Sequence, residues 1–333
     1  MNQRVSDPLA LPRLAVGYYA SQHFGDAPPE ISDSVLAEIR FGGSPQFSSR
    51  GLHINVELDA LGAPAPVEVW HAQGPVRCDS DGSVRFAEDA HHVFAVVEAD
   101  ERMHGGILGA TEFAYAQVRR FQRNSPYPHV LRMWNYLDEA NEGDGDMERY
   151  RQFCVGRTRG LGDGLSESYP AASAVGRQRT THVLQVYWLA GRIAGVAVEN
   201  PRQVSAYRYP HIYGPVSPSF SRATLAPDDT LMISGTASIV GHASHHIGDV
   251  TAQLDETLRN LETLIEQAGR QRPGIGHCLS DDTHLKVYVR DAAQLAVIEK
   301  HLRSRLPGIQ ATYLAADICR RELLLEIECA QRG

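Results

Sequence analysis

LLLEIECA (residues 323–330), close to the end of the 333-residue sequence, decides the fold because it reads as a strand with two unlike faces. One face is apolar at period two and carries Leu323, Leu325, Ile327 and Cys329. The opposite face carries Leu324, Glu326 and Glu328. Two explanations exist for carboxylates on such an apolar strand. Their face meets water, as is usual for an edge strand, or it holds a carboxyl group in a partly buried catalytic site.

Two helices and three more strands precede this strand. IGDVTAQLDETLRNLETLIEQAG (247–269) has apolar residues at helical spacing, with Asp249 placed to cap its start and Gly269 just past its end. A second helix is expected at about 291–306, where Pro307 stops it. Strands are expected at 231–240, 284–290 and 309–315. The order β-α-β-α-β-β predicts one sheet layered on two helices.

The middle of the chain carries a weaker version of the same pattern. A strand at 92–99, a helix at 111–122 and a strand at 130–137 follow one another. Other strands are expected at 53–60, 67–72, 183–190 and 193–199. We therefore expect an α+β protein whose N-terminal part is a degenerate copy of the C-terminal one, although no residue identity supports the repeat.

Composition and charge argue against several classes of protein. The formal net charge of −8 argues against a nucleic-acid partner. No apolar run is long enough to cross a bilayer, and residues 1–20 lack the apolar core of a signal peptide. The five cysteines are scattered without a CxxC pair, which is typical of reduced thiols. We expect a cytoplasmic protein with no nucleic-acid or membrane partner.

Glycine and histidine patterns predict no cofactor. GRTRGLGDG (156–164) has no strand before it, so a loop is favoured over a dinucleotide-binding turn. The pair His91-His92 and the trio His242, His245 and His246 match no established zinc pattern. Surface or turn histidines are the favoured interpretation, with a metal site as the alternative.

A helical reading of DMERYRQFCVGRTRG (146–160) gathers one set of side chains on a single face. The set is Met147, Tyr150, Cys154 and Arg157. Such a face could grip an anion, because a guanidinium binds a carboxylate bidentately. A surface helix with its basic side in water explains the spacing equally well. Further along, the Pro-, Tyr- and Arg-rich stretch 200–223 is interpreted as a seam between two domains, where ligand sites collect.

The last third of the chain resembles the YjgF/RidA superfamily of enamine/imine deaminases. The matching segments are SGTASIVG (234–241), HLKVYVRDAAQLAVIEKHL (284–302) and LLLEIECA. The signature arginine of that superfamily falls on Ala311. A deaminase is therefore an alternative that lacks its main anion-binding residue.

Almost the whole chain resembles a narrower group, the chorismatases. The segments are RMWNYLDEANEGDGDMERYRQFCVGR (132–157), SAYRYPHIYGPVSPSFSRA (205–223), SGTAS (234–238) and CRRELLLEIE (319–328). This resemblance implies an N-terminal α+β domain over residues 1–215, a YjgF/RidA-like domain over 216–333, and an active site between them.

The same resemblance implies roles for individual residues. Glu326 falls on the catalytic glutamate, and Tyr150 and Arg157 fall on residues that hold the substrate carboxylates. Tyr213 belongs to the aromatic loop of the family pattern, and its partner in that loop is Arg208 or Tyr209. Ala237 and Cys319 fall where the family separates product types, and Cys319 resembles the residue of the aromatising types, one strand away from Glu326.

The implied reaction removes pyruvate from chorismate, the expected small-molecule partner, without a cofactor or metal. Glu326 is expected to stay protonated in an apolar site and to protonate the enolpyruvyl group. The expected product is 3-hydroxybenzoate, with 4-hydroxybenzoate as a second product. Hydrolysis to a dihydroxycyclohexadiene carboxylate is the alternative, and a non-catalytic metabolite-binding module is a further one. We expect a monomer, because one chain supplies both sides of the cleft.

Overall fold

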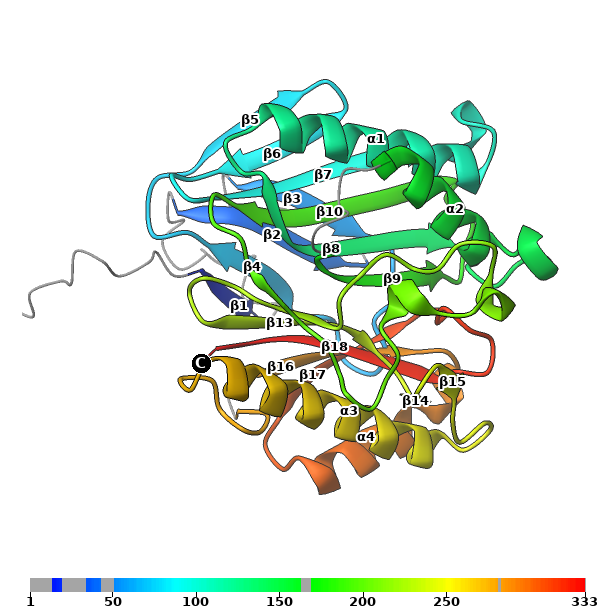
Figure 1. The fold of residues 1–333 in the computed structure, drawn as a ribbon. Coiled ribbons are helices and arrows are strands. Elements are labelled where there is room, and N and C mark those ends of the chain that lie inside the picture. Colours follow the sequence, from blue (N-terminus) through cyan, green and yellow to red (C-terminus); the bar gives the residue numbers. More distant parts are fainter. Residues whose placement is uncertain (1–13, 20–33, 43–50, 163–168, 281–282, 333) are drawn as a thin grey trace, which may run out of the picture.

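The structure is a computed structural model that describes residues 14–19, 34–42, 51–162, 169–280 and 283–332. Figure 1 shows a layered molecule in which helices cover the outer faces of two large sheets. Residues 1–13, part of the stretch used to predict localisation, lie outside the described residues, as do the last two residues of the glycine-rich stretch.

The C-terminal half is one sheet layered on two helices, as the sequence predicts. In spatial order its strands are β11 (Val196–Val198), β12 (Ala223–Leu225), β13 (Thr230–Thr236), β18 (Leu325–Arg332), β16 (His284–Val289) and β17 (Gln310–Ala315). The helices are α3 (Val250–Gln271) and α4 (Leu295–Arg305), which lie together on its outer face in Figure 1. Asp249 caps α3 by accepting hydrogen bonds from two backbone amides of its first turn.

The N-terminal half repeats this arrangement strand for strand. Its sheet has the order β5 (Arg77–Asp81), β6 (Val84–Glu88), β7 (His92–Asp100), β10 (Val183–Gly191), β8 (His129–Asp138) and β9 (Ala171–Arg177). Its helices are α1 (Ile107–Asn124) and α2 (Arg149–Leu161). In both halves the last two strands of the sheet are parallel and the other neighbours antiparallel. The degenerate copy is therefore visible as a shared topology.

Two small sheets complete the molecule. The larger has the order β1 (Ala15–Tyr19), β4 (Val67–His71), β2 (Val35–Phe41) and β3 (Leu52–Val56), and the smaller pairs β14 (Ile239–Val240) with β15 (Ala243–Ser244). The division of the chain at residues 215 and 216 stays a prediction, since the C-terminal sheet already takes its first strand from Val196–Val198.

The apolar residues form outer cores and an inner core. One outer core lies under α1 and α2, and the other under α3 and α4. The inner core lies between the sheets and is rich in aromatic rings, among them Trp70, Phe94 and Trp134. Because β18 contributes its apolar face to an outer core, its other face, with Glu326 and Glu328, must point inward.

Four local predictions are wrong. β18 lies between β13 and β16 rather than at an edge, so the solvated-face interpretation of Glu326 and Glu328 fails. Gly269 lies inside α3, which continues to Gln271. Met147 precedes α2 in a short 3₁₀ turn and is 70% exposed. Finally, the first part of the glycine-rich stretch is helical, because α2 extends to Leu161.

The glycines explain why that stretch is helical. Gly156 and Gly160 lie one turn apart on α2 and face α1. A Cβ atom would come within 2.8 Å of Thr111 Cβ at Gly156 and within 2.7 Å of Tyr115 Cβ at Gly160. The glycines therefore let the two helix backbones approach closely, and this approach positions α2 beside the cavity described below. None of the helices in the described ranges is long and apolar enough to span a bilayer.

Candidate active site

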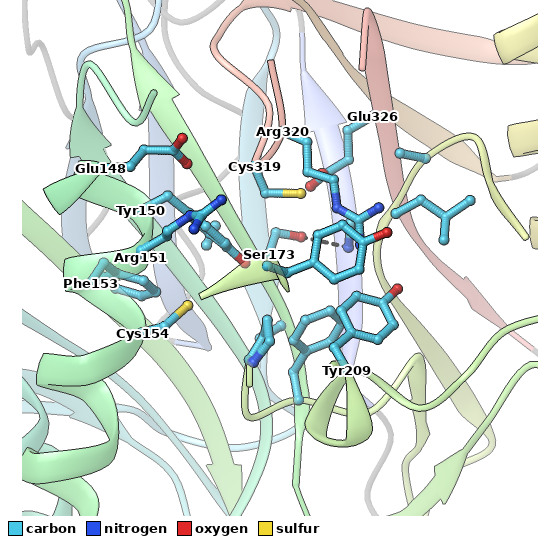
Figure 2. Close-up of a pocket in the computed structure, with 18 of the residues that line it drawn as sticks. Glu148, Tyr150, Arg151, Phe153, Cys154, Ser173, Tyr209, Cys319, Arg320 and Glu326 are labelled. Carbon is cyan, nitrogen blue, oxygen red and sulfur yellow. Dashed lines mark hydrogen bonds between the residues drawn. The ribbon is translucent and has the colours of Figure 1, made fainter. Parts of the chain in front are cut away.

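A cavity of about 320 Å³ lies between the two halves of the molecule (Figure 2). Its wall combines residues of α2 and β9 with the 205–222 segment, and residues of β13 and β18 with the loop that precedes β18. This volume falls in the range of about 300–1,000 Å³ that is usual for small-molecule sites. The seam predicted at 200–223 is thus part of the wall, through Tyr209, Tyr213 and Arg222 among others.

Glu326 is the acidic group at the centre of this wall. β18 is covered on both sides, and the Glu326 residue is only 4% exposed. Among the described residues, none donates a hydrogen bond to its carboxyl group. Burial, reinforced by the charge of Glu328, raises the pKa of Glu326 to about 8, and the opposing effects of Arg132 and Arg222 are smaller. At neutral pH the group is therefore mostly an uncharged acid.

Gly235 leaves the space that Glu326 occupies. It lies on β13, next to β18, and a Cβ atom there would overlap Oε1 of Glu326. The backbone N–H of Gly235 donates a 2.9 Å hydrogen bond to Oγ of Ser173 on β9. Both Gly235 and Ser173 line the cavity.

Glu328, two residues further on the same face, has the opposite character. It accepts a hydrogen bond from Ser173 and others of 2.8 Å from Arg132 and from Nε1 of Trp134. Nζ of Lys286 lies 2.6 Å from its Oε1. Burial alone would raise the pKa of Glu328, but Lys286 and Arg132 lower it to about 2. Glu328 is therefore a carboxylate at every physiological pH.

Three of the five arginines that line the cavity have a buried nitrogen without a hydrogen-bond partner among the described residues: Arg157, Arg222 and Arg320. These nitrogens are Nε of Arg157, Nε of Arg222 and Nη2 of Arg320. A buried donor without a partner is costly, because it has lost its bond to water. Several guanidinium groups around one cavity fit a ligand with more than one carboxylate.

Protein contacts hold each of these arginines in place. The guanidinium of Arg157 lies over the ring of Tyr115, 5.0 Å from its centroid. Arg222 donates to the hydroxyl of Tyr209 at 2.6 Å. Arg320 lies 3.7 Å from the ring centroid of Tyr213 and donates from Nη1 to the carbonyl of His242 at 2.9 Å. The arginines are thus oriented before a ligand arrives.

The structure brings most of the predicted site residues together. Those that line the cavity are Tyr150, Arg157, Tyr209, Tyr213, Ala237, Cys319 and Glu326. Arg208 is the exception: its side chain is exposed and lies against the ring of Tyr207. Tyr209, the other residue considered for that role, is therefore the one at the cavity.

The cavity also contains two thiols and a buried phenol. Burial raises the pKa of Cys154 and of Cys319 to about 12 and that of Tyr150 well above its usual value. All three groups are therefore uncharged at neutral pH. Cys319 lies in the loop between β17 and β18, not on a neighbouring strand as expected, and its side chain points into the cavity near Glu326 in Figure 2. The negative charge of ionised Glu326 contributes to the raised pKa of Cys319.

Sequence reasoning missed four residues of this site: Ser173, Arg222, Gly235 and Arg320. Arg222 and Arg320 lie in segments already singled out, and their signal was the presence of arginine beside tyrosine-rich or acidic stretches. Gly235 lies in the quoted segment SGTAS, but neither its role nor that of Ser173 is marked there, since both depend on strands that are distant in sequence.

The histidines considered as metal ligands and the deaminase position Ala311 do not line this cavity. His242 contacts Tyr213 with its ring nitrogen, and His246 contacts Glu256. In the described part of the chain, no three His, Cys, Asp or Glu side chains gather in a way that could hold a metal ion. Ala311 lies on β17 and lines a separate groove of about 220 Å³.

The chain is similar to known proteins in sequence and in fold. The family model described as "Chorismatase FkbO/Hyg5-like, N-terminal" matches residues 68–190. A Streptomyces hygroscopicus protein named "Chorismatase" is 38% identical over 270 residues, 78% of this chain and 78% of that protein. A "3-hydroxybenzoate synthase" of the same species is 33% identical over 317 residues, 90% of this chain and 92% of that protein. A chorismatase crystal structure matches with a TM-score of 0.84 and 31% identity, covering 96% of this chain and 98% of that one.

Proposed function

Because the chain belongs to the chorismatase family, we propose that it removes pyruvate from chorismate with Glu326 as the general acid. The observation that carries this proposal is the state of Glu326: a buried and mostly uncharged carboxyl group inside a cavity lined by five arginines. The reaction involves no net oxidation or reduction, so we propose that the enzyme needs no redox cofactor.

Chorismate is a dianion with one carboxylate on the ring and one on the enolpyruvyl group. We assign Arg157, with Tyr150, to one carboxylate, and Arg222 and Arg320 to the region of the other. The unpaired guanidinium nitrogens of these arginines then gain acceptors. Tyr209 and Tyr213 present their rings beside Arg320 and give the diene ring an apolar surface.

The chemical step begins with proton transfer from Glu326 to the methylene carbon of the enolpyruvyl group. The double bond supplies the electron pair, and an oxocarbenium ion forms on the ether side. Its positive charge and the new Glu326 carboxylate then attract each other. A positioned general acid is typically worth about 10²–10⁴-fold in rate.

The fate of the oxocarbenium ion decides the product. When the ring hydroxyl attacks the neighbouring ring carbon, the ether bond breaks and its electrons stay with pyruvate. Glu326 takes the hydroxyl proton, and the resulting arene-oxide-like species aromatises to 3-hydroxybenzoate without net use of water. We propose 4-hydroxybenzoate as a second product of the same intermediate. Attack by water would instead give a dihydroxycyclohexadiene carboxylate.

Cys319 and Ala237 are the residues to which we assign the choice between these outcomes. Both line the cavity, and Cys319 is an uncharged thiol close to Glu326 that can pass on a proton. Incubation with chorismate followed by chromatography tests this assignment. We expect a hydroxybenzoate from the native chain, and a pure dihydrodiol would contradict the aromatising route.

The function itself is tested by pyruvate release from chorismate, followed with lactate dehydrogenase. We expect release by the native chain and a fall of about 10²–10⁴-fold in Glu326→Gln. Glutamine keeps the size of the side chain, so chorismate binding measured by calorimetry should stay within a few-fold. Pyruvate release at the native rate by Glu326→Gln would contradict the assignment.

We also propose that the enzyme is a monomer in the cytoplasm. Residues from both halves of one chain line the cavity, so no second copy is required to complete it. All five cysteines are free thiols, as expected in a reducing compartment.

A further inference from the structure

A row of alternating charges crosses the inner core beside Glu326. Oε2 of Glu68 on β4 lies 2.9 Å from Nζ of Lys286 on β16. The same Nζ lies 2.6 Å from Oε1 of Glu328, and Nη2 of Arg132 on β8 lies 2.8 Å from Oε2 of Glu328. The row therefore joins the four-stranded sheet to both six-stranded sheets, and its two carboxylates and two cations balance.

All four side chains of this row are buried, with at most 3% of any side chain exposed. Removing an ion from water costs several kcal/mol, and a buried ion pair often stabilises a protein no more than well-packed apolar residues do. Stability alone is therefore a weak explanation for the row. Its position next to the general acid suggests another.

Glu328 is placed to act on Glu326 through space. The two residues share one face of β18, and a strand advances about 3.3 Å per residue, so their backbones are about 6.6 Å apart. Glu328 has no free capacity for a ligand, since Arg132, Trp134, Lys286 and Ser173 already occupy its oxygens. What it presents to Glu326 is a permanent negative charge.

We infer that Glu328 is a positioning residue for the general acid: a fixed buried anion that keeps Glu326 protonated until substrate binds. The proton is then in place before the dianionic substrate enters. Lys286 and Arg132 hold Glu328 in its ionised form, and Glu68 holds Lys286. This inference rests on the proposed role of Glu326 as the acid.

Ser173 connects Glu328 to the strand that packs against Glu326. Its hydroxyl donates to Oε2 of Glu328 and accepts from Nη2 of Arg132 at 2.6 Å and from the N–H of Gly235 at 2.9 Å. Gly235 in turn lies against Oε1 of Glu326. The anion and the acid are thus held at a fixed separation by β9, β13 and β18 together.

Other charged or titratable groups also face the acid. They are Arg132 from β8, Glu148 just before α2, Tyr150, Arg151, Cys154 and Arg157 from α2, Tyr209, Tyr213 and Arg222 before β12, Tyr288 from β16, and Cys319, Arg320, Arg321 and Glu322 before β18. The buried tyrosines and thiols of this set are neutral at pH 7, and Arg132 and Arg222 favour ionisation of Glu326. Unlike the carboxylates of this set, Glu328 is fixed by ion pairs in the interior.

The test compares Glu328→Gln with the matched control Glu68→Gln. Each variant removes one of the two carboxylates that contact Nζ of Lys286, and Glu328→Gln also removes the partner of Arg132. Only Glu328 shares a strand face with Glu326. The measurement is kcat/KM for pyruvate release between pH 5.5 and 9.5, because its alkaline limb reports the acid of the free enzyme.

We expect Glu328→Gln to move the alkaline limb to lower pH by about one unit or more, since a close like charge no longer opposes ionisation. At pH 8 kcat/KM should fall about fivefold further than at pH 6. Glu68→Gln should leave the limb in place. An unmoved limb in Glu328→Gln, or equal losses at every pH in both variants, would overturn the inference and leave the row a structural role only.

Two further measurements keep the test decisive. Where Glu328→Gln does not fold, Glu328→Gln combined with Lys286→Met removes both charges and should show the same shift of the limb. A carbon-13 NMR titration of the Glu326 carboxyl group in the free protein needs no substrate. It should show the lower midpoint in Glu328→Gln even if native protein releases no pyruvate from chorismate, an outcome that would refute the proposed function alone.

Discussion

Glu326 and Glu328 have the same side chain on the same face of β18, yet their surroundings hold them in opposite charge states. Glu328 has two cations and two further donors around it, whereas Glu326 has an empty cavity and a neighbouring anion. Pairs of carboxyl groups whose pKa values are pushed apart are typical of acid–base sites. The difference comes from tertiary partners, because both residues occupy the same kind of position on the strand.

The raised pKa of Glu326 predicts a stability that depends on pH. The folded state holds the proton up to about pH 8, whereas the unfolded chain releases it near 4.5. The stabilising contribution of this group is therefore complete below about pH 4.5 and is lost as the pH rises through 8. Since each pKa unit corresponds to about 1.4 kcal/mol, native protein should lose several kcal/mol relative to Glu326→Gln.

Urea unfolding of both proteins at pH 5 and at pH 8 measures this difference. All other titratable groups are the same in the two proteins. Their contribution to the pH dependence of the unfolding free energy therefore cancels when native protein is compared with Glu326→Gln. A difference in unfolding free energy that is the same at both pH values would show that Glu326 ionises normally in the folded protein.

Gly235→Ala should impair catalysis by displacing the acid. The new methyl group would overlap Oε1 of Glu326 and approach Oγ of Ser173 to 3.1 Å. We expect kcat to fall more than tenfold, because small displacements of a catalytic group are costly. The control is Gly274→Ala, where a Cβ meets no atom within 4 Å. Unchanged kcat in Gly235→Ala would contradict the placement of Glu326.

Sequence reasoning reached part of this site. Glu326, Tyr150 and Arg157 were predicted because motif segments and helical spacing mark them. The charge state of Glu328 could not be predicted, since it depends on Arg132 and Lys286, which are far away in sequence. The sequence does not distinguish Arg208, which lies outside the cavity lining, from Tyr209, because adjacent residues of an irregular segment have no periodicity that assigns their directions.

At the scale of elements, the contact between α1 and α2 positions the arginine side of the cavity. Gly160→Ala should push α2 away from α1, because a Cβ at that position lies 2.7 Å from Tyr115 Cβ. Overpacking of this kind typically costs about 1–3 kcal/mol of unfolding free energy. Arg157 lies three residues earlier on α2, so we also expect KM for chorismate to rise.

Chemical denaturation of Gly160→Ala beside Gly274→Ala measures the effect. Ordinarily alanine is the better helix former by about 1 kcal/mol. A stabilised Gly160→Ala protein would therefore show that the two helices do not pack as closely as the structure has them.

The irregular 205–222 segment, which carries Tyr209 and Tyr213, is the second element that shapes the cavity. The ring of Tyr213 lies under Arg320 at 3.7 Å, while its hydroxyl contacts His242 at 3.2 Å. Tyr213→Leu removes the ring, and KM for chorismate should rise roughly 2- to 5-fold, the equivalent of about 0.5–1 kcal/mol for a cation–π contact. Tyr213→Phe keeps the ring and should have a smaller effect. Equal effects of both substitutions would assign the role to the hydroxyl instead.

At the scale of the whole molecule, two halves of one topology face each other and build a site that neither contains alone. The element order of the C-terminal half was predicted because its helices have clear caps and strong periodicity. The N-terminal half was predicted less completely: its last helix was partly interpreted as a loop, since glycines that serve helix packing resemble glycines that serve turns. How the halves face each other could not be predicted, because that arrangement depends on long-range packing.

The proposed mechanism depends most on an uncharged Glu326, and infrared spectroscopy of the free protein tests this directly. The difference between native protein and Glu326→Gln isolates the carbonyl stretch of this one carboxylic acid. We predict that the acid band is present at pH 7 and disappears with a midpoint of about 8. A band already absent at pH 7, with a midpoint near 4.5, would contradict the account.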